Sequence, residues 1–423
     1  MPTWLTVLIT AAATAAAMLV ARAFGRREKR IEHKVDPIHR AGDEQFRRSV
    51  GAILGSSLSD GNEITAYRNG DEIFPPMLQA IAAARHTITF ETFIYWNGRI
   101  GHRFADALAE RARAGVRVHV ILDWFGSKKM DQSIIETLRR AGVTVERYHR
   151  ARWYNLANAN HRTHRKILVT DGHTGFTGGV GIADPWLGNA RHPGEWRDTH
   201  FRLRGPAVVQ LQRAFMDNWL KTHSDVLHAR DYFPPLEPAG DAPAHVFMSS
   251  ADQGSESARL LFLLSIAAAR EDIRIATAYF VPDQLTTEAL LDARRRGVRV
   301  RVIVPGPHID KTVVRRASRA GWGRLLEAGV QIHEYQPAMY HCKFMVIDGS
   351  WTCVGSANFD HRSFRLNDEV NLNAQHAPLA ATLIEHFETD LADAQRITHE
   401  DWRTRPVRER VAEHAAALLR HQL

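Results

Sequence analysis

The sequence is poor in cysteine. Only Cys342 and Cys353 occur in 423 residues, and two thiols cannot staple a chain of this size, so its stability must come from a buried core. A reducing compartment is permitted, because the fold does not depend on disulfides. Arg165 stands in place of Cys342 in the first copy of the repeated motif described below, so we interpret Cys342 as a small core residue.

Lysine is also scarce, at eight of the 55 basic residues. Two of the eight stand at the same place in two similar stretches, HRKILVTDG at 164–172 and HCKFMVIDG at 341–349. The shared pattern, His-x-Lys-x-x-x-x-Asp-Gly, recurs after 177 residues, which makes incidental surface charge a poor explanation of the lysines. The repetition indicates a position that requires a compact ammonium rather than a guanidinium.

Negative charge is not in excess, since the formal net charge is +8. A basic protein is attracted to polyanions, and both a nucleic acid backbone and an anionic membrane surface fit that description. The hydrophobic fraction of 44% and the charged fraction of 24% are those of a globular protein rather than a disordered one. Charge alone does not choose between the two partners.

Long uncharged runs are rare, and the informative one covers residues 4–21, followed by Arg22 and a basic cluster at 26–30. Eighteen residues are just enough to span a bilayer. A cleaved signal peptide would carry its positive charge before the apolar run, and a buried core helix is the other alternative. We expect a single-pass anchor over 4–24 in the inner (cytoplasmic) membrane, with the basic flank and the catalytic part facing the cytoplasm.

Beyond this flank the sequence repeats one plan. An apolar strand-like run at 86–96 precedes a helix pattern, a glycine stop and a second strand at 103–123. The runs at 271–283 and 285–305 repeat this order, and each half then reaches its copy of the motif. Strands that alternate with helices predict an α/β fold, here two duplicated sandwich domains that form one pseudo-symmetric unit.

The expected boundaries follow from these patterns and from four prolines between 234 and 243, which indicate a linker. They are 4–24 for the anchor, 25–60 for a linker and lead-in, 61–230 for the first domain, 231–245 for the proline-rich linker, and 246–423 for the second domain with a C-terminal helix from Val407.

The spacing inside the motif separates its residues into two groups. On a strand, side chains alternate between faces, so His and Lys of one copy share a face, whereas the Asp seven residues after the His has the opposite parity. Asp-Gly is a tight-turn signal, so we expect Asp171 and Asp348 to fix the turn. The paired His and Lys residues then face the site.

Two histidines and two lysines suit phosphodiester chemistry. Lysines stabilise the anionic oxygens of the phosphate, one histidine forms a phospho-enzyme and the other protonates the leaving alkoxide. Because one motif supplies one histidine, we expect each half to contribute half of a single active site at their interface. A metal site is disfavoured, because His161 and His164 have no carboxylate or Cys partner that recurs in both halves at ligand spacing. No metal or other cofactor is expected.

The doubled motif has specific surroundings. GSANFDHRSFRLNDE at 355–369 follows the second copy, and TGGVGIADPW at 177–186 with EWRDTHFRL at 195–203 follows the first. These stretches resemble the phospholipase D superfamily, and within it the bacterial cardiolipin synthases, over most of residues 60–400. The resemblance implies phospholipase D-like sandwich domains.

The resemblance also implies that a phosphatidyl group is transferred in two steps. One histidine attacks the phosphorus of phosphatidylglycerol to give a phosphatidyl-histidine, while the other protonates the departing glycerol and then deprotonates a second phosphatidylglycerol, so that cardiolipin and glycerol result. By analogy His164 is the nucleophile and His341 the acid and base, although near-symmetric halves leave that order open. The partners expected are phosphatidylglycerol and an anionic membrane, without nucleic acid.

The resemblance assigns further residues. The catalytic set is His164, Lys166, Asp171, His341, Lys343 and Asp348. Lys166, Lys343, Asn358 and Ser356 would bind the phosphate of the substrate. Asp198 and Glu369 occupy the places where the family keeps a carboxylate that orients a histidine, and ordinary surface charge is the alternative interpretation. One departure is that Gly179 and Gly181 replace the serine and asparagine in the first half, which removes a phosphate donor there unless a backbone N–H replaces it.

Three other functions share these residues. A phospholipase D type hydrolase would use water as the acceptor, a nuclease would suit the positive charge and show salt-sensitive binding, and a lipid-binding protein would need no catalysis. The intact catalytic residues disfavour the last, and the apolar N-terminal run favours a lipid substrate. Aromatic stretches at 152–155 and 185–188 either insert into the membrane interface or pack in the core.

Overall fold

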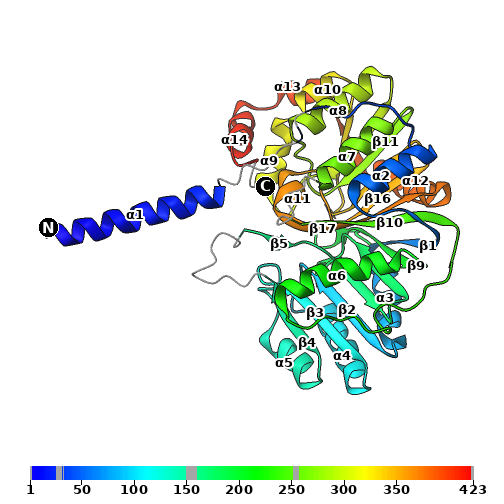
Figure 1. Cartoon of the computed structure of the whole chain (residues 1–423). Coiled ribbons are helices and arrows are strands. Elements are labelled where there is room, and N and C mark those ends of the chain that lie inside the picture. The colour runs from blue at the N-terminus through cyan, green and yellow to red at the C-terminus, as the bar shows by residue number, and fades with distance from the viewer. Residues whose placement is uncertain (1, 25–30, 32, 149–159, 251–256, 421–423) are drawn as a thin grey trace.

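A computed structural model of the chain describes residues 2–24, 31, 33–148, 160–250 and 257–420. Two halves lie against each other, each with strands covered by helices (Figure 1). Sixteen strands of the described residues form one continuous sheet through both halves. The expected mixed α/β fold with two related halves is therefore confirmed.

The strand order repeats from the junction outward. The first half runs β1 (Ser59–Arg68), β9 (Thr199–Arg204), β7 (Thr174–Gly178), β6 (Ile167–Thr170), β2 (Thr87–Thr92), β3 (Arg117–Asp123) and β4 (Thr144–Tyr148). The second runs β10 (Ala242–Ser249), β17 (Asn367–Gln375), β16 (Trp351–Gly355), β15 (Lys343–Ile347), β11 (Asp272–Thr277), β12 (Arg299–Pro305) and β13 (Gln331–Tyr335), with β18 (Ala394–Ile397) added at the edge. Because β1 pairs with β10 in antiparallel fashion, the junction is itself part of the sheet.

Helices connect and cover these strands. They are α3 (Asn69–Ala83), α4 (Arg99–Arg113), α5 (Gln132–Arg140) and α6 (Val208–Thr222) in the first half, and α7 (Ser257–Ala268), α8 (Gln284–Arg295), α9 (Thr312–Ala320), α10 (Gly323–Glu327), α11 (His361–Arg365), α12 (Ala377–Ala392), α13 (His399–Thr404) and α14 (Val407–Ala417) in the second. Strand β2 is buried on both faces, as expected for an apolar strand between helix layers. One core cluster contains Leu211 and Phe215 of α6 together with Leu383 and Phe387 of α12, so the two halves share a core.

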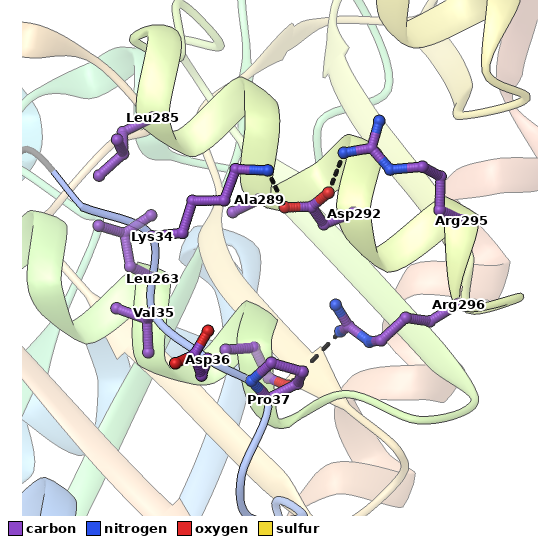
Figure 2. A pocket seen from close by; sticks show the side chains of 11 residues that line it. Lys34, Val35, Asp36, Pro37, Leu263, Leu285, Ala289, Asp292, Arg295 and Arg296 are labelled. Carbon is purple, nitrogen blue, oxygen red and sulfur yellow. Dashed lines mark hydrogen bonds and ion pairs between the residues drawn. The ribbon is translucent and has the colours of Figure 1, made fainter.

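The segment before β1 packs on the second half, although it precedes the first half in sequence. Helix α2 (Glu44–Leu54) places Phe46 edge-on to Trp351, with 5.1 Å between ring centroids. Lys34 pairs with Asp292 of α8 at 2.8 Å, beside a cavity of about 270 Å³ between this segment, α7 and α8 (Figure 2). The lead-in therefore stabilises the distal half.

Helix α1 (Thr3–Phe24) extends away from the body of the molecule (Figure 1). Several of the apolar side chains that are described on it are exposed, namely Trp4, Val7, Leu8, Ile9 and Met18. Within the described part of the chain, no helix is both long and apolar enough to cross a membrane. The expected membrane span over 4–24 is thus not confirmed.

Candidate active site

Two short strand pairs carry the histidines across the junction. Strand β5 (Arg162–Thr163), just before His164, pairs in parallel with the start of β17, and the His164 N–H donates to the carbonyl of Asp368 at 2.9 Å. Strand β14 (Met339–Tyr340), just before His341, pairs with β8 (Trp196–Arg197), and the His341 N–H donates to the carbonyl of Arg197 at 2.7 Å. Each histidine is thus held by backbone of the opposite half.

The carboxylates cross in the same way. Nδ1 of His164 lies 2.9 Å from Oε2 of Glu369, and Nδ1 of His341 lies 2.7 Å from Oδ2 of Asp198. Both carboxylates are fully buried, so the interpretation of ordinary surface charge is wrong. Because Nδ1 faces a carboxylate in each ring, Nε2 is the atom that can meet substrate. At His341, Nζ of Lys343 lies 3.2 Å from this Nε2.

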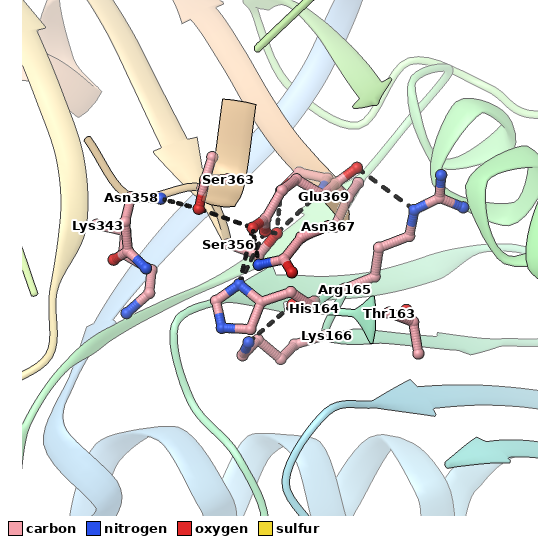
Figure 3. A network of polar contacts seen from close by, with 12 residues as sticks. Thr163, His164, Arg165, Lys166, Lys343, Ser356, Asn358, Ser363, Asn367 and Glu369 are labelled. Carbon is pink, nitrogen blue, oxygen red and sulfur yellow. Dashed lines mark hydrogen bonds and ion pairs between the residues drawn. The ribbon is translucent and has the colours of Figure 1, made fainter. Parts of the chain in front are cut away.

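Glu369 has a dense set of donors (Figure 3). The hydroxyls of Ser356 and Ser363 donate to it at 2.5 and 2.9 Å, and the amide of Asn367 donates at 3.2 Å. Since a hydroxyl has one proton, Ser356 in this arrangement orients the carboxylate and does not donate to a phosphate. Ser363 and Asn367 were not singled out from the sequence, although both lie in the stretch 355–369.

Asp198 has a different set. The indole N–H of Trp186 donates to it at 2.9 Å and the backbone N–H of Thr199 at 2.8 Å. A Cβ on Gly179, which stands where the second half has Ser356, would lie 2.1 Å from Oδ1 of Asp198. The glycine therefore makes room for the carboxylate. At Gly181 a Cβ would lie 2.8 Å from Cβ of Ile94 and 3.1 Å from the Trp186 ring, so these two side chains occupy the space of the absent asparagine.

The lysines stand beside their own histidines. Nζ of Lys166 donates to the carbonyl of His164 at 2.7 Å, and Nζ of Lys343 donates to the carbonyl of His341 at 2.7 Å. Both are buried. The side-chain oxygen of Asn358 is also buried and has no hydrogen-bond partner among the described residues. The two ammonium groups are available to an anion, which the amide of Asn358 could bind only through its NH2 group and not through this oxygen.

The two aspartates of the motif lie in the turns. Asp171 and Asp348 adopt positive φ angles of 51° and 47° before glycine, a conformation that aspartate tolerates better than most residues. The Asp171 carboxylate accepts the backbone N–H groups of 85–87, and the Asp348 carboxylate accepts those of 270–272. Both carboxylates therefore tie a turn to the start of the neighbouring strand.

Burial and charge set the protonation states. Burial, followed by Lys166 and Lys343, holds the pKa of His164 well below its ordinary value, and burial lowers the pKa of His341 to about 4 with Lys343 adding to it. Burial alone would raise the pKa of Asp198, but His341 and then Lys343 outweigh it and the pKa is lowered. Without substrate, both histidines are neutral and Asp198 is ionised.

The pKa of the other carboxylate, Glu369, is shifted in the opposite direction. Burial raises the pKa of Glu369 to about 7 although Lys166 opposes it, and burial with Lys343 lowers the pKa of Lys166 to about 7. These two groups titrate as a pair. The site therefore combines near-symmetric geometry with asymmetric electrostatics.

The family described as "Cardiolipin synthase, PLD-like domain" matches residues 77–187 and 263–391, the two stretches that contain the histidine motifs. The cardiolipin synthase of Geobacillus sp. (strain WCH70) is 36% identical over 398 residues, which cover 93% of this chain and 78% of that protein. Cardiolipin synthase 2 of Bacillus cereus (strain ATCC 14579) is 35% identical over 92% of this chain and 76% of that protein. The chain belongs to the phospholipase D-like cardiolipin synthase family.

Solved structures show the same fold. The phosphatidylserine synthase of Haemophilus influenzae Rd KW20 superimposes with a TM-score of 0.70 over 90% of this chain and all of that chain, at 13% identity. At this identity the likeness extends to the fold alone. Within the family fold, the described residues contain no group of three or more His, Cys, Asp or Glu arranged to hold a metal ion.

The aromatic stretches near the first motif have separate outcomes. Trp186 is buried at 1% exposure and bonds Asp198, so it is a core residue of this cardiolipin synthase family member and not a membrane contact. Trp153 lies outside the described residues.

Proposed function

We propose that the enzyme makes cardiolipin and glycerol from two molecules of phosphatidylglycerol through a phosphatidyl-His164 intermediate. The observation that carries the proposal is the crossed pair of histidines, each bonded to a carboxylate of the other half beside a buried lysine. Two cardiolipin synthases are 36% and 35% identical to the chain over more than nine tenths of its length, which supports the same activity.

In the first step Nε2 of His164 attacks phosphorus. The N–P bond forms as the bond from phosphorus to the glycerol oxygen breaks, and His341 gives its Nε2 proton to that oxygen. Lys166, Lys343 and Asn358 stabilise the phosphate oxygens. The bound anion raises the proton affinity of His341 above that in the empty site.

In the second step the terminal hydroxyl of another phosphatidylglycerol replaces the histidine. Its proton passes to Nε2 of His341 as the new O–P bond forms and the N–P bond breaks. His341 is thereby ready for the next cycle.

The electrostatic asymmetry supports this division of roles. An acid and base must hold a proton as imidazolium, and Asp198, whose pKa is lowered, provides a fixed negative charge at Nδ1 of His341. Glu369, with a pKa of about 7, provides weaker support for an imidazolium. His164 is therefore the better candidate for the neutral nucleophile.

Product analysis tests the proposal. The purified enzyme is incubated with labelled phosphatidylglycerol in excess EDTA, beside His164→Ala and His341→Ala variants. Cardiolipin and glycerol, lost in both variants, are the expected result. Phosphatidic acid as the product would replace the proposal with a hydrolase, and a requirement for metal would contradict the mechanism.

The same proposal includes attachment to the cytoplasmic membrane through α1. Supporting it are the eighteen uncharged residues 4–21, the basic cluster at 26–30 and the exposed apolar side chains of the helix. The catalytic part faces the cytoplasm. A variant that lacks residues 1–24 is expected to leave the membrane fraction, and a C-terminal fluorescent fusion is expected to fluoresce; a variant that stays on the membrane would assign attachment to another surface.

A further inference from the structure

Three exposed lysines of the described chain stand apart from its other lysines. Of the lysines that the structure describes, Lys166 and Lys343 lie inside the site, and Lys34 and Lys221 pair with carboxylates. Lys128, Lys129 and Lys311 have no carboxylate within 4 Å among the described residues, and each lies over an aromatic ring. Most basic residues of this chain are arginines, so the presence of lysine at these three positions requires an explanation.

A series of contacts through two tryptophans connects Lys129 to the ring of His341. Its Nζ lies 4.1 Å from the ring centroid of Trp96, and Trp96 lies edge-on to Trp196 with centroids 6.4 Å apart. Trp196 in turn lies 5.2 Å from the ring of His341. The Lys129 carbonyl accepts the N–H of Asn97, so the backbone of this lysine is fixed.

Lys311 approaches the same place from the second half. Its Nζ lies 5.5 Å from the ring centroid of Tyr279, and Tyr279 and Trp196 both pack against the cluster of Ala278, Ile309 and Met339. The Tyr279 hydroxyl donates to Asp310 at 2.9 Å, which engages that carboxylate. The charge of Lys311 contributes to the lowered pKa of His164, so its field reaches the catalytic centre.

The first turn of α9 adds positive potential beside Lys311. Lys311 is the N-cap of this nine-residue helix, and no side chain caps its amide N–H groups. Free N–H groups at a helix start attract anions. Lys129 and Lys311 thus belong to opposite halves, and the ring beside each lysine is connected to Trp196, by direct contact for Trp96 and through a shared cluster for Tyr279.

The proposed reaction has a need that this arrangement meets. The donor phosphate takes Lys166, Lys343 and Asn358, but an acceptor phosphatidylglycerol brings a second phosphate, one glycerol length from the hydroxyl that His341 deprotonates. We propose that Lys129 and Lys311 form an acceptor subsite above Trp196, which binds the phosphate of the second phosphatidylglycerol and presents its hydroxyl to Nε2 of His341. This inference rests on the proposed function and deepens it.

The subsite gives a physical reason for transfer in place of hydrolysis. Water carries no phosphate and gains nothing from the lysines, whereas an anionic lipid is concentrated at the entrance and oriented there. Acceptor choice would then depend on two charges that take no part in the first step.

Two acceptors in one assay separate this role from others. Vesicles of phosphatidylglycerol in phosphatidylcholine are incubated with labelled glycerol, so that cardiolipin synthesis and glycerol exchange into phosphatidylglycerol are measured together. Both reactions use the same phosphatidyl-enzyme, but free glycerol has no phosphate. The Lys129→Gln/Lys311→Gln double variant is expected to make at least about tenfold less cardiolipin while exchange stays within about twofold.

Matched variants and outcomes complete the test. The Lys128→Gln variant, which removes a neighbouring exposed charge, is expected to behave as wild type, and Lys129→Arg/Lys311→Arg is expected to restore most of the cardiolipin. Unchanged cardiolipin synthesis in the glutamine double variant, or an equal fall in both reactions, would overturn the subsite while the proposed function stands. A wild-type enzyme that exchanges glycerol but makes no cardiolipin would overturn both.

Discussion

His164 and Glu369 lie 205 residues apart in the sequence and meet across the junction, with Nδ1 of the histidine 2.9 Å from Oε2 of the carboxylate. His341 and Asp198 form the reciprocal contact at 2.7 Å. Neither histidine finds its carboxylate in its own half. The duplicated halves are therefore two parts of one catalytic unit, and the continuous sheet with its shared core holds the parts in register.

The roles of the two histidines are separable by the leaving group. In a substrate with a p-nitrophenyl headgroup, the leaving group is a nitrophenolate, which needs no proton. His341→Ala is therefore expected to release about one equivalent of nitrophenol in a burst, while transfer to phosphatidylglycerol falls by about 10²–10⁴-fold. His164→Ala is expected to give no burst, because the nucleophile is missing. Rapid-mixing absorbance measurements check both variants. A burst from His164→Ala and none from His341→Ala would reverse the roles.

The paired titration of Glu369 and Lys166 predicts a narrow pH optimum. The pKa of Glu369 is raised to about 7 and that of Lys166 is lowered to about 7. As the pH falls through 7, Glu369 takes a proton and no longer accepts a hydrogen bond from Nδ1–H of His164. This bond holds the proton of His164 on Nδ1 and so keeps Nε2 free to attack. As the pH rises through 7, Lys166 loses the charge that binds phosphate. kcat/KM is expected to fall on both sides of about pH 7.

The Glu369→Gln variant provides the control for this assignment. Glutamine does not titrate, so its kcat/KM profile is expected to lose the acid limb. Because the charge of Glu369 raises the pKa of Lys166, the limb from Lys166 is expected to move to lower pH. A wild-type profile that stays flat from about pH 6 to pH 9 would contradict the assignment.

A buried charge network ties the junction beside His341. Asp390 of α12 is fully buried and accepts from Arg197 at 2.8 Å, from Arg68 at 2.7 Å and from the Tyr340 hydroxyl at 3.0 Å. Asp390→Asn leaves the Arg197 guanidinium without its counter-charge, and the expected loss of stability is about 3–5 kcal/mol. The midpoint of thermal unfolding measures it. Among the described residues, the exposed Asp241 forms an ion pair with His376 alone, so an equally large loss in Asp241→Asn would refute the argument.

Repetition made part of the site predictable. His164, Lys166, His341 and Lys343 were identifiable because the same short pattern occurs twice, and the period of a strand placed His and Lys together. The Asp-Gly pairs correctly indicated turns, since turn geometry depends on local residues. The repeated pattern, the strand period and the turn signal each depend on residues only a few positions apart in the sequence.

The crossing of the carboxylates was not predictable in this way. It depends on the pairing of β5 with β17 and of β8 with β14, which joins segments far apart in the chain. The same holds for α2, which packs on the half that is distant in sequence. Trp186 was recognised as aromatic, but its hydrogen bond to Asp198 follows from tertiary packing.

Gly179 connects the sequence departure to the chemistry. The second half has Ser356 at the matching place, where the hydroxyl bonds Glu369, but in the first half a Cβ would collide with Oδ1 of Asp198 at 2.1 Å. Gly179→Ser is therefore expected to displace Asp198 from His341. Because a misplacement of about 1 Å costs about 10²-fold in rate, we expect kcat to fall by about that factor, with a loss of stability of about 1–3 kcal/mol.

Gly42→Ser is the matched control, because a Cβ there meets its nearest atom at 3.9 Å and the residue is exposed. This variant is expected to retain the activity and the unfolding midpoint of the wild type. Steady-state kinetics on phosphatidylglycerol, with thermal unfolding of the same preparations, compares the two. Full activity in Gly179→Ser would show that Asp198 tolerates a side chain at its back, and that the glycine in the first half does not serve the orientation of His341.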